Sequence, residues 1–335
     1  MKRISVILLI LVFLCGCQKS TAKLLEELGY SEEDITLIES LSEENQARFL
    51  ESYDEELLEL IKLQDFKEEK IDEYLKYRGD LEDEKLIEMV NNGMINDGNH
   101  SKMKELYASE YYVPRKEKLY LQYLDSCNDV RSMMEIVNTG RYRDLYTDIE
   151  TTDVSKKELM LVNKYYQLPA DYVPDELVDV EAALGRGQLQ KEVYEAYKPL
   201  YEEAKKLGYD LTIVSSYRSY DYQYGLYNKY LQSDPQEVVD TYSARPGHSE
   251  HQSGLCMDVT IPGYSLDNFY KSDASKWLAE NCYRFGFIIR YPEDKTDITG
   301  YQGEPWQLRY LGKAVAEDVY KRGITYDEYY ACFVE

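Results

Sequence analysis

Two short stretches of the chain carry residues whose types and spacing suit metal-dependent hydrolysis. The first, residues 249–258, reads Ser-Glu-His-Gln-Ser-Gly-Leu-Cys-Met-Asp, so that an imidazole (His251) and a carboxylate (Asp258) stand seven residues apart. The second, residues 304–307, reads Glu-Pro-Trp-Gln and offers another carboxylate, Glu304. A hydrolytic zinc site uses three protein ligands, an open position for water and a nearby carboxylate as general base. His251 and Asp258 have the chemistry of two such ligands.

The order of these residues resembles the VanY-type D-alanyl-D-alanine carboxypeptidases, zinc enzymes that trim peptidoglycan stem peptides. The pattern of that family is Ser-x-His-x-x-Gly-x-Ala-x-Asp followed by Glu-x-x-His. The matching residues are Ser249, His251, Gly254, Asp258 and Glu304. The resemblance extends over roughly residues 160 to 335. It implies a zinc site that includes His251 and Asp258.

The same resemblance implies roles for the residues around the metal. Glu304 is the expected general base, which takes a proton from the attacking water. Arg218, in Ser-Tyr-Arg-Ser at residues 216–219, corresponds to the arginine that holds substrate and stabilises developing negative charge. Gln223, Ser249 and Trp306 are the other expected substrate contacts. Two alternatives without a functional role stay open: Gln223 as an exposed helix residue, and Trp306 as part of the core.

The chain departs from the family pattern at two positions. Gln307 replaces the last zinc-binding histidine, and Cys256 replaces the alanine. An amide oxygen is a poorer zinc donor than an imidazole nitrogen, so Gln307 predicts weak metal binding. A rearranged site could use His248 or the Cys256 thiolate instead, although a small buried residue is the favoured interpretation of Cys256. The third histidine, His100, belongs to a separate helical region.

The N-terminus has the pattern of a bacterial lipoprotein signal. Lys2 and Arg3 precede an apolar run over residues 4–14, which ends in Leu-Cys-Gly-Cys at residues 14–17. The run is too short to span a bilayer as a helix. We expect residues 1–17 to be the signal region, with Cys17 lipidated and the protein held outside the cytoplasm on the bacterial cell membrane. A plain signal peptide is the alternative.

The composition is strongly acidic, with 39 basic and 63 acidic side chains and a net charge of −24. Such a charge repels the phosphate backbone, and it argues against a nucleic-acid partner. No later stretch is apolar enough to cross a membrane. The cysteines beyond Cys17 form no Cys-x-x-Cys pair, so a structural zinc knuckle is not expected. Buried free thiols are the expected state, although the predicted compartment permits a disulfide.

The pattern of helix and turn signals divides the remaining chain into three parts. Residues 18–150 are rich in Glu, Lys and Leu and predict short helices, with N-caps at Ser31 and Ser42. Residues 151–183 form a connector, and residues 184–335 the DD-carboxypeptidase-like catalytic domain. This domain predicts an α+β fold, a small antiparallel sheet with flanking helices, because its strands and helices do not alternate as βαβ units. The expected helices cover 191–207, 220–231 and 312–322, and the expected strands cover 211–214, 259–261 and 287–290.

Three functions are compatible with this sequence. The first is a zinc carboxypeptidase that removes the terminal D-alanine of peptidoglycan stem peptides. The second is a catalytically impaired relative that keeps the cleft and binds stem peptides as a cell-wall scaffold or sensor. In the third, the N-terminal helices dock an unknown protein while the C-terminal domain anchors the chain to the wall. Gln307 is the residue that separates the first function from the second.

Overall fold

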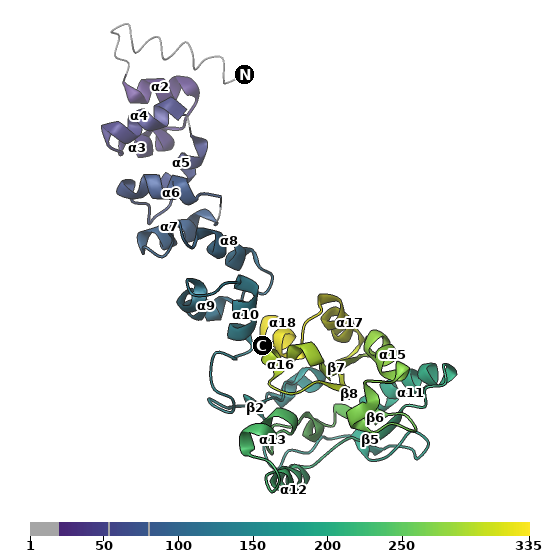
Figure 1. Cartoon of the computed structure of the whole chain (residues 1–335). Helices are drawn as coiled ribbons and strands as arrows, with labels where there is room; N and C mark the ends of the chain where they lie inside the picture. The colour runs from purple at the N-terminus through teal and green to yellow at the C-terminus, as the bar shows by residue number, and fades with distance from the viewer. Residues whose placement is uncertain (1–19, 53, 80) are drawn as a thin grey trace. The chain divides into compact units, whose positions relative to one another are not determined.

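The computed structural model describes residues 20–52, 54–79 and 81–335 (Figure 1). The predicted lipoprotein signal and Cys17 lie outside these residues. Contacts divide the chain between Ser109 and Glu110 into two compact units. Across the part of the chain that the structure describes, no helix is both long and apolar enough to cross a bilayer.

The first unit is helical, as the sequence predicts. Ser31 and Ser42 cap helices as expected, because their hydroxyls accept hydrogen bonds from the backbone N–H of Asp34 at 3.1 Å and of Asn45 at 3.4 Å. Apolar side chains at helical spacing, among them Leu25, form the core of this unit. The helices are α2 (Thr21–Leu28), α3 (Glu32–Glu39), α4 (Glu43–Ser52), α5 (Glu55–Ile61), α6 (Ile71–Tyr77), α7 (Asp83–Asn91) and α8 (His100–Ala108).

The second unit begins with two further helices, α9 (Glu117–Leu124) and α10 (Val130–Asn138). They belong to it because α10 packs against the C-terminal helix α18 (Tyr326–Phe333). An ion pair joins the same two helices, because Arg131 contacts Glu328 at 3.3 Å. A second ion pair links the segment before α9 to the C-terminal part of the chain, where Arg322 contacts Glu110 at 2.7 Å. The sequence-based boundary at residue 150 therefore lies inside this unit, since contacts between residues about 200 positions apart leave no local signal.

The centre of the second unit is a four-stranded antiparallel sheet with strand order β5-β6-β8-β7. This sheet and its flanking helices confirm the predicted α+β class. Because side chains alternate along a strand, Met257, Val259 and Leu308 point into the main core, where they pack with helix α11 (Lys191–Lys206). The opposite face of β6 and β8 is left for polar residues. The strands are β5 (Thr212–Ser215), β6 (Cys256–Thr260), β7 (Phe287–Tyr291) and β8 (Glu304–Tyr310).

Helices flank the sheet on both sides in Figure 1, with α12 and α13 on one side and α15 and α17 on the other. The predicted helices and strands are all present, with ends that differ by at most three residues from the predicted ones; the sequence analysis did not predict β8 or α18. The helices are α11 (Lys191–Lys206), α12 (Tyr220–Tyr230), α13 (Gln236–Tyr242), α14 (Leu266–Phe269), α15 (Asp273–Asn281), α16 (Thr296–Thr299) and α17 (Lys313–Arg322). Short pairs β1 (Glu150–Thr151) with β2 (Tyr166–Gln167) and β3 (Leu177–Asp179) with β4 (Gln188–Gln190) precede the main sheet.

Candidate active site

A cavity of about 360 Å³ lies over the polar face of β6 and β8. Its walls come from the segment after β5, the start of α12, the loop before β6 and the first residues of β8. The structure brings together every metal-site and substrate-site residue that the sequence predicts. The lining includes Arg218, Gln223, Ser249, His251, Asp258, Glu304, Trp306 and Gln307.

His251 sits in a single turn of 3-10 helix, η4 (Glu250–Ser253), which ends at Gly254. Gly254 has φ +68°, and a Cβ there would lie 3.1 to 3.3 Å from the side chains of Leu177, Gln190 and Pro174, so only glycine fits this turn. The His251 Nδ1 stands 2.7 Å from the Ser216 carbonyl oxygen. Because a carbonyl only accepts, Nδ1 is the donor of this hydrogen bond, and Nε2 is the ring nitrogen left to face the cavity.

Asp258 faces Nε2 of His251 from strand β6. Its Oδ1 lies 3.4 Å from His251 Nε2 and accepts no hydrogen bond from the described residues. Its Oδ2 accepts a hydrogen bond of 2.7 Å from Arg218 Nη2. Burial alone would raise the pKa of Asp258, but the nearby His251, Arg218 and Ser215 side chains outweigh burial and lower the pKa. Asp258 is therefore an ionised carboxylate with one oxygen directed at His251.

Gln307 occupies the position directly opposite Asp258 on the neighbouring strand β8. Directly paired residues of antiparallel strands project from the same face of the sheet, so the two side chains enter the same cavity. Gln307 is buried and lines the cavity together with His251. This register agrees with the sequence-based alignment of Gln307 to the third ligand position.

The side chains present fit a zinc ion with one weak ligand. Two ligand atoms at about 2.0–2.1 Å from a tetrahedral zinc stand about 3.3 Å apart, and Nε2 of His251 and Oδ1 of Asp258 are 3.4 Å apart. The Nδ1 contact with a backbone carbonyl is the arrangement that orients zinc-binding histidines. No group of three His, Cys, Asp or Glu side chains suited to a metal occurs among the described residues. The third donor in this arrangement would be the neutral amide of Gln307, which lies opposite Asp258.

Glu304 begins strand β8 on the wall of the same cavity. Loss of solvation in the cleft and the negative charge of Asp258 raise the pKa of Glu304 to about 8, although Arg218 and Arg290 oppose the shift. A general base must be ionised when it takes up a proton, and the positive charge of a bound metal would favour that form of Glu304. The position of Glu304 on the cavity wall suits the predicted role.

Arg218 and Gln223 form the end of the cavity next to β5. Ser215 Oγ accepts hydrogen bonds from Nε and Nη2 of Arg218 at 2.9 and 2.7 Å, which fixes the guanidinium plane. Gln223 is buried, so it is not the exposed helix residue of the alternative interpretation. Its amide nitrogen donates to the Ala244 carbonyl at 2.8 Å, while its amide oxygen has no partner among the described residues. That oxygen is free to accept a hydrogen bond from a ligand.

Trp306 and Ser249 complete the predicted set in different ways. Trp306 is half-buried, packs against the main core and also lines the cavity, so both interpretations of this tryptophan hold. Ser249 is buried at the cavity wall, immediately before η4. Each therefore borders the cavity in which a substrate would lie.

The other side chains that the sequence offered as metal donors lie outside the site. The His248 ring contacts the Asn163 carbonyl at 2.8 Å and packs edge-on against Tyr146, outside the cavity lining. Cys256 shares the strand face of Asp258, but it lies opposite Arg309 and is a buried free thiol, with a pKa raised by burial. His100 belongs to helix α8 of the first unit.

Sequence reasoning missed a buried ion-pair network behind His251. Glu250 Oε1 accepts hydrogen bonds of 2.8 Å from both Arg290 and Arg309, and Arg290 also donates to Asp327 at 2.6 Å. All four side chains are buried. The network ties η4 to strands β7 and β8 and to helix α18. The one available signal was Glu250 itself, a charged residue inside the motif.

Comparison with known proteins agrees with this geometry. A family model described as VanY, D-alanyl-D-alanine carboxypeptidase, matches residues 186–313. The putative carboxypeptidase YodJ of Bacillus subtilis (strain 168) is 41% identical over 54% of this chain and 70% of its own length. A D-alanyl-D-alanine carboxypeptidase of Enterococcus faecalis (strain ATCC 700802 / V583) is 33% identical over 55% of this chain and 70% of its own length.

A solved structure supports the same assignment for the fold. The LdcB LD-carboxypeptidase is 39% identical, with a TM-score of 0.51, over 55% of this chain and 90% of that chain. The motif residues gather in one cleft, and the relatives match over more than two thirds of their own length. The chain therefore belongs to the VanY D-alanyl-D-alanine carboxypeptidase family.

Proposed function

We propose that this protein is a zinc-dependent D-alanyl-D-alanine carboxypeptidase that hydrolyses the terminal D-alanine from peptidoglycan stem peptides. The observation that carries the proposal is the pair of His251 Nε2 and Asp258 Oδ1, 3.4 Å apart in a cavity that Glu304 also lines. Peptide hydrolysis at a metal requires metal ligands, a carboxyl group that can accept a proton and a fixed positive charge such as a guanidinium.

The position of each residue in the cleft suggests its role in the reaction. Arg218 presents a fixed guanidinium at the β5 end, where it suits the carboxylate of a peptide C-terminus or the oxygen that gains charge at the scissile carbonyl. The free amide oxygen of Gln223 accepts a hydrogen bond from a peptide N–H. Glu304 takes the proton from the attacking water and returns it to the departing amine. A zinc ion held by His251, Asp258 and Gln307 would supply Lewis-acid activation.

A second function is favoured by Gln307. An amide in place of the third ligand weakens zinc binding, whereas Arg218, Gln223 and Trp306 still line a cavity of the right kind for a peptide end. On this alternative, the protein binds stem peptides without efficient turnover and acts as a cell-wall scaffold or sensor. The two functions use the same cleft and differ in the occupancy of the metal site.

Release of D-alanine from a pentapeptide stem by the zinc-supplemented chain tests the proposal. A tetrapeptide that ends in an L,D bond is assayed in parallel, because the LdcB neighbour is an LD-carboxypeptidase. Glu304→Gln is the matched variant, since it keeps the size of the side chain and removes the base. If the natural chain releases D-alanine and Glu304→Gln abolishes this release, the result supports the hydrolase. Peptide binding by both proteins without release supports the scaffold or sensor.

The N-terminal motif and the net charge support a location and a set of partners. We propose that Cys17 carries a lipid that holds the protein on the outer face of the bacterial cell membrane, where stem peptides are accessible. The acidic net charge of −24 keeps such a protein away from nucleic acid and anionic head groups. The N-terminal helical unit serves as a spacer or as a docking surface for another protein. Metabolic labelling with a palmitate analogue, in the natural chain and in Cys17→Ser, tests the anchor.

A further inference from the structure

We infer that a second cavity beside the catalytic cleft binds the sugar to which the stem peptide is attached. This inference rests on the proposed function, because it assigns a position to the part of the substrate that lies beyond the scissile bond. The second cavity has a volume of about 940 Å³ and lies entirely within the second unit. It is larger than the catalytic cavity, and none of the predicted metal-binding residues lines it.

The two cavities are neighbours. Five residues line both: Asp267, Tyr291, Gln302, Gly303 and Trp306. These residues form the boundary over which a substrate held in the first cavity would extend into the second.

Strand order fixes the direction in which the substrate must run. Arg218 follows β5 at one edge of the sheet, Glu304 begins β8 in the interior, and Tyr291 ends β7 at the other edge. If Arg218 holds the C-terminal carboxylate, the peptide crosses β8 at the scissile bond and continues past β7. The second cavity lies on that far side, lined by β7, by the end of α15 and by α17.

The stem peptide is long enough to leave the catalytic cavity. Neighbouring strands of a sheet lie about 4.8 Å apart, so β7 is one such step from β8. Four extended residues span about 13 Å. A stem peptide with its scissile bond at β8 therefore extends past β7, and its sugar end lies on the side of the second cavity.

The lining of the second cavity has the chemistry of a sugar site. Tyr270 and Tyr320 are 52% and 44% exposed, so their rings are open to a ligand. Tyr283 stacks on Tyr320 with ring centroids 4.1 Å apart and holds that ring in place. Trp306 also lines the cavity, so these rings offer aromatic surface to the C–H face of a pyranose.

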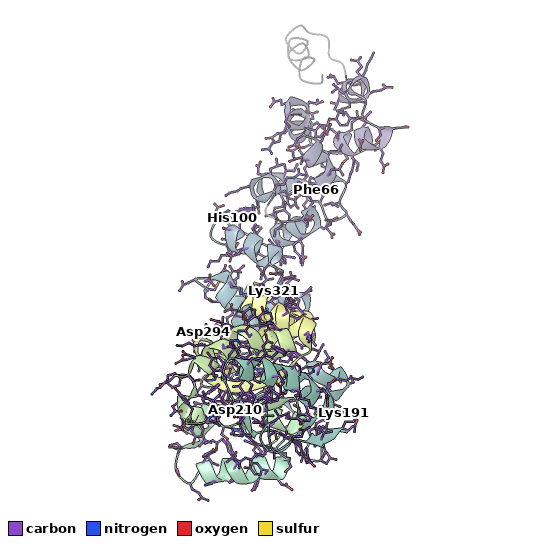
Figure 2. The ribbon with its side chains drawn as sticks, turned by 90° about the vertical axis from the view of Figure 1, so that its right-hand side faces the viewer. Phe66, His100, Lys191, Asp210, Asp294 and Lys321 are labelled. Atoms are coloured by element: carbon purple, nitrogen blue, oxygen red, sulfur yellow. The ribbon has the colours of Figure 1, made fainter. Side chains whose placement is uncertain are left out.

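Hydrogen-bond acceptors stand at the rim of the same cavity. Asp267, Glu293 and Asp294 contribute carboxylates, and Gln302 contributes an amide. These groups suit the hydroxyl and acetamido N–H groups of an N-acetylated disaccharide. Figure 2 shows Asp294 at the surface of the second unit, on the side of the view opposite Lys191, where α11 begins. The rim residues are exposed, so a ligand can reach them from solvent.

Calorimetric binding to the zinc-supplemented full chain carrying Glu304→Gln tests this inference without consuming the ligand. The free pentapeptide and the same pentapeptide on its N-acetylated disaccharide are compared. We expect the disaccharide to lower Kd about tenfold, and Tyr320→Ala to remove about twofold to tenfold of that gain, which matches the loss of one aromatic contact. Tyr320→Phe keeps the ring and should keep the gain.

Control variants separate this inference from the proposed function. Tyr142→Ala removes a tyrosine that is 39% exposed and lines neither cavity, so it should change neither affinity. Equal affinity for the two ligands would overturn the sugar site and leave the proposed function standing. A cross-linked peptide dimer without sugar that shows the full gain would assign the cavity to a second stem peptide and overturn the inference. Failure of both ligands to bind would overturn the proposed function and the sugar site together.

Discussion

Gln307 lies directly opposite Asp258 in the register of strands β8 and β6, with both side chains in one buried cavity. One oxygen of Asp258 accepts no hydrogen bond from the described residues, and Gln307 is a neutral amide at the position where the family pattern has a histidine. The position of the third family ligand is therefore retained, whereas its side chain is a weaker zinc donor. On the proposed function, the affinity for zinc, rather than the architecture of the cleft, would determine the rate of hydrolysis.

Replacement of Arg218 by alanine should weaken stem-peptide binding about 10- to 100-fold, because a charge-assisted hydrogen bond contributes about 1.5–3 kcal/mol. Arg218→Lys should recover only part of the affinity, since lysine keeps the charge but cannot contact Ser215 and Asp258 through one planar group. Calorimetry on zinc-supplemented protein checks both values. Equal affinity of the alanine variant and the natural chain would remove Arg218 from the substrate site.

Gln223→Leu tests the unpartnered amide oxygen. The change removes a hydrogen-bond acceptor from the cleft at nearly constant side-chain volume, and it also leaves the Ala244 carbonyl without its 2.8 Å donor. We expect about fivefold to 50-fold weaker peptide binding from the loss of about 1–2 kcal/mol. Gln223→Glu keeps an acceptor and is the matched control. A leucine variant that binds peptide as tightly as the natural chain contradicts the assigned role.

The raised pKa of Glu304 predicts a pH dependence of stability in the metal-free protein. Its pKa is about 8 in the folded chain, whereas a glutamate in water has a pKa near 4.5, so the folded chain binds more protons between these values. The free energy of unfolding should therefore fall as pH rises from about 4.5 to 8, and Glu304→Gln should reduce this slope. Urea denaturation of chelator-treated protein, followed by tryptophan fluorescence, measures it, because both tryptophans lie in the second unit. An identical slope in the variant would contradict the assignment.

Substitution of a residue in the buried ion-pair network should strongly destabilise the protein, even where that residue is far from the cavity in sequence. Asp327→Asn leaves the buried Arg290 with Glu250 as its one carboxylate partner, which Arg309 shares. We expect the free energy of unfolding to fall by about 3–5 kcal/mol. Asp318→Asn is the matched control, because Asp318 pairs with Arg322 at 2.9 Å on the surface and should cost less than about 1 kcal/mol. Equal losses in the two variants would show that the buried network contributes no more than a surface pair.

Local patterns in the sequence were enough to predict much of the second unit. Helix α11 and strand β5 have clear ends and apolar periodicity, and the motif at residues 249–258 located the cleft. Strand β8 was missed because Pro305 argues against a strand. The structure accommodates this proline at the start of β8, where the register with β7 shifts between Ile289 and Tyr291.

Long-range partners explain the other omissions. Arg290 is a charged residue at the end of an apolar run, and no neighbouring residue in the sequence indicates that it is fully buried. Its partner Asp327 lies 37 residues away, in a helix that the sequence analysis did not predict. Likewise, the buried state of Gln223 depends on a hydrogen bond to Ala244, 21 residues further on. Local periodicity cannot contain such information.

The most direct test of the central claim compares the natural chain with Gln307→His, using zinc affinity and the rate of D-alanine release from a pentapeptide stem. Gln232→His, which adds a histidine at an exposed position outside the cleft, is the matched control. The account predicts that Gln307→His raises zinc affinity by more than about 100-fold, since changes beyond the direct ligands already cost about 10- to 100-fold, and increases release in parallel, whereas Gln232→His changes neither. If Gln307→His neither binds zinc more tightly nor releases D-alanine faster than the natural chain, His251, Asp258 and residue 307 do not form the metal site.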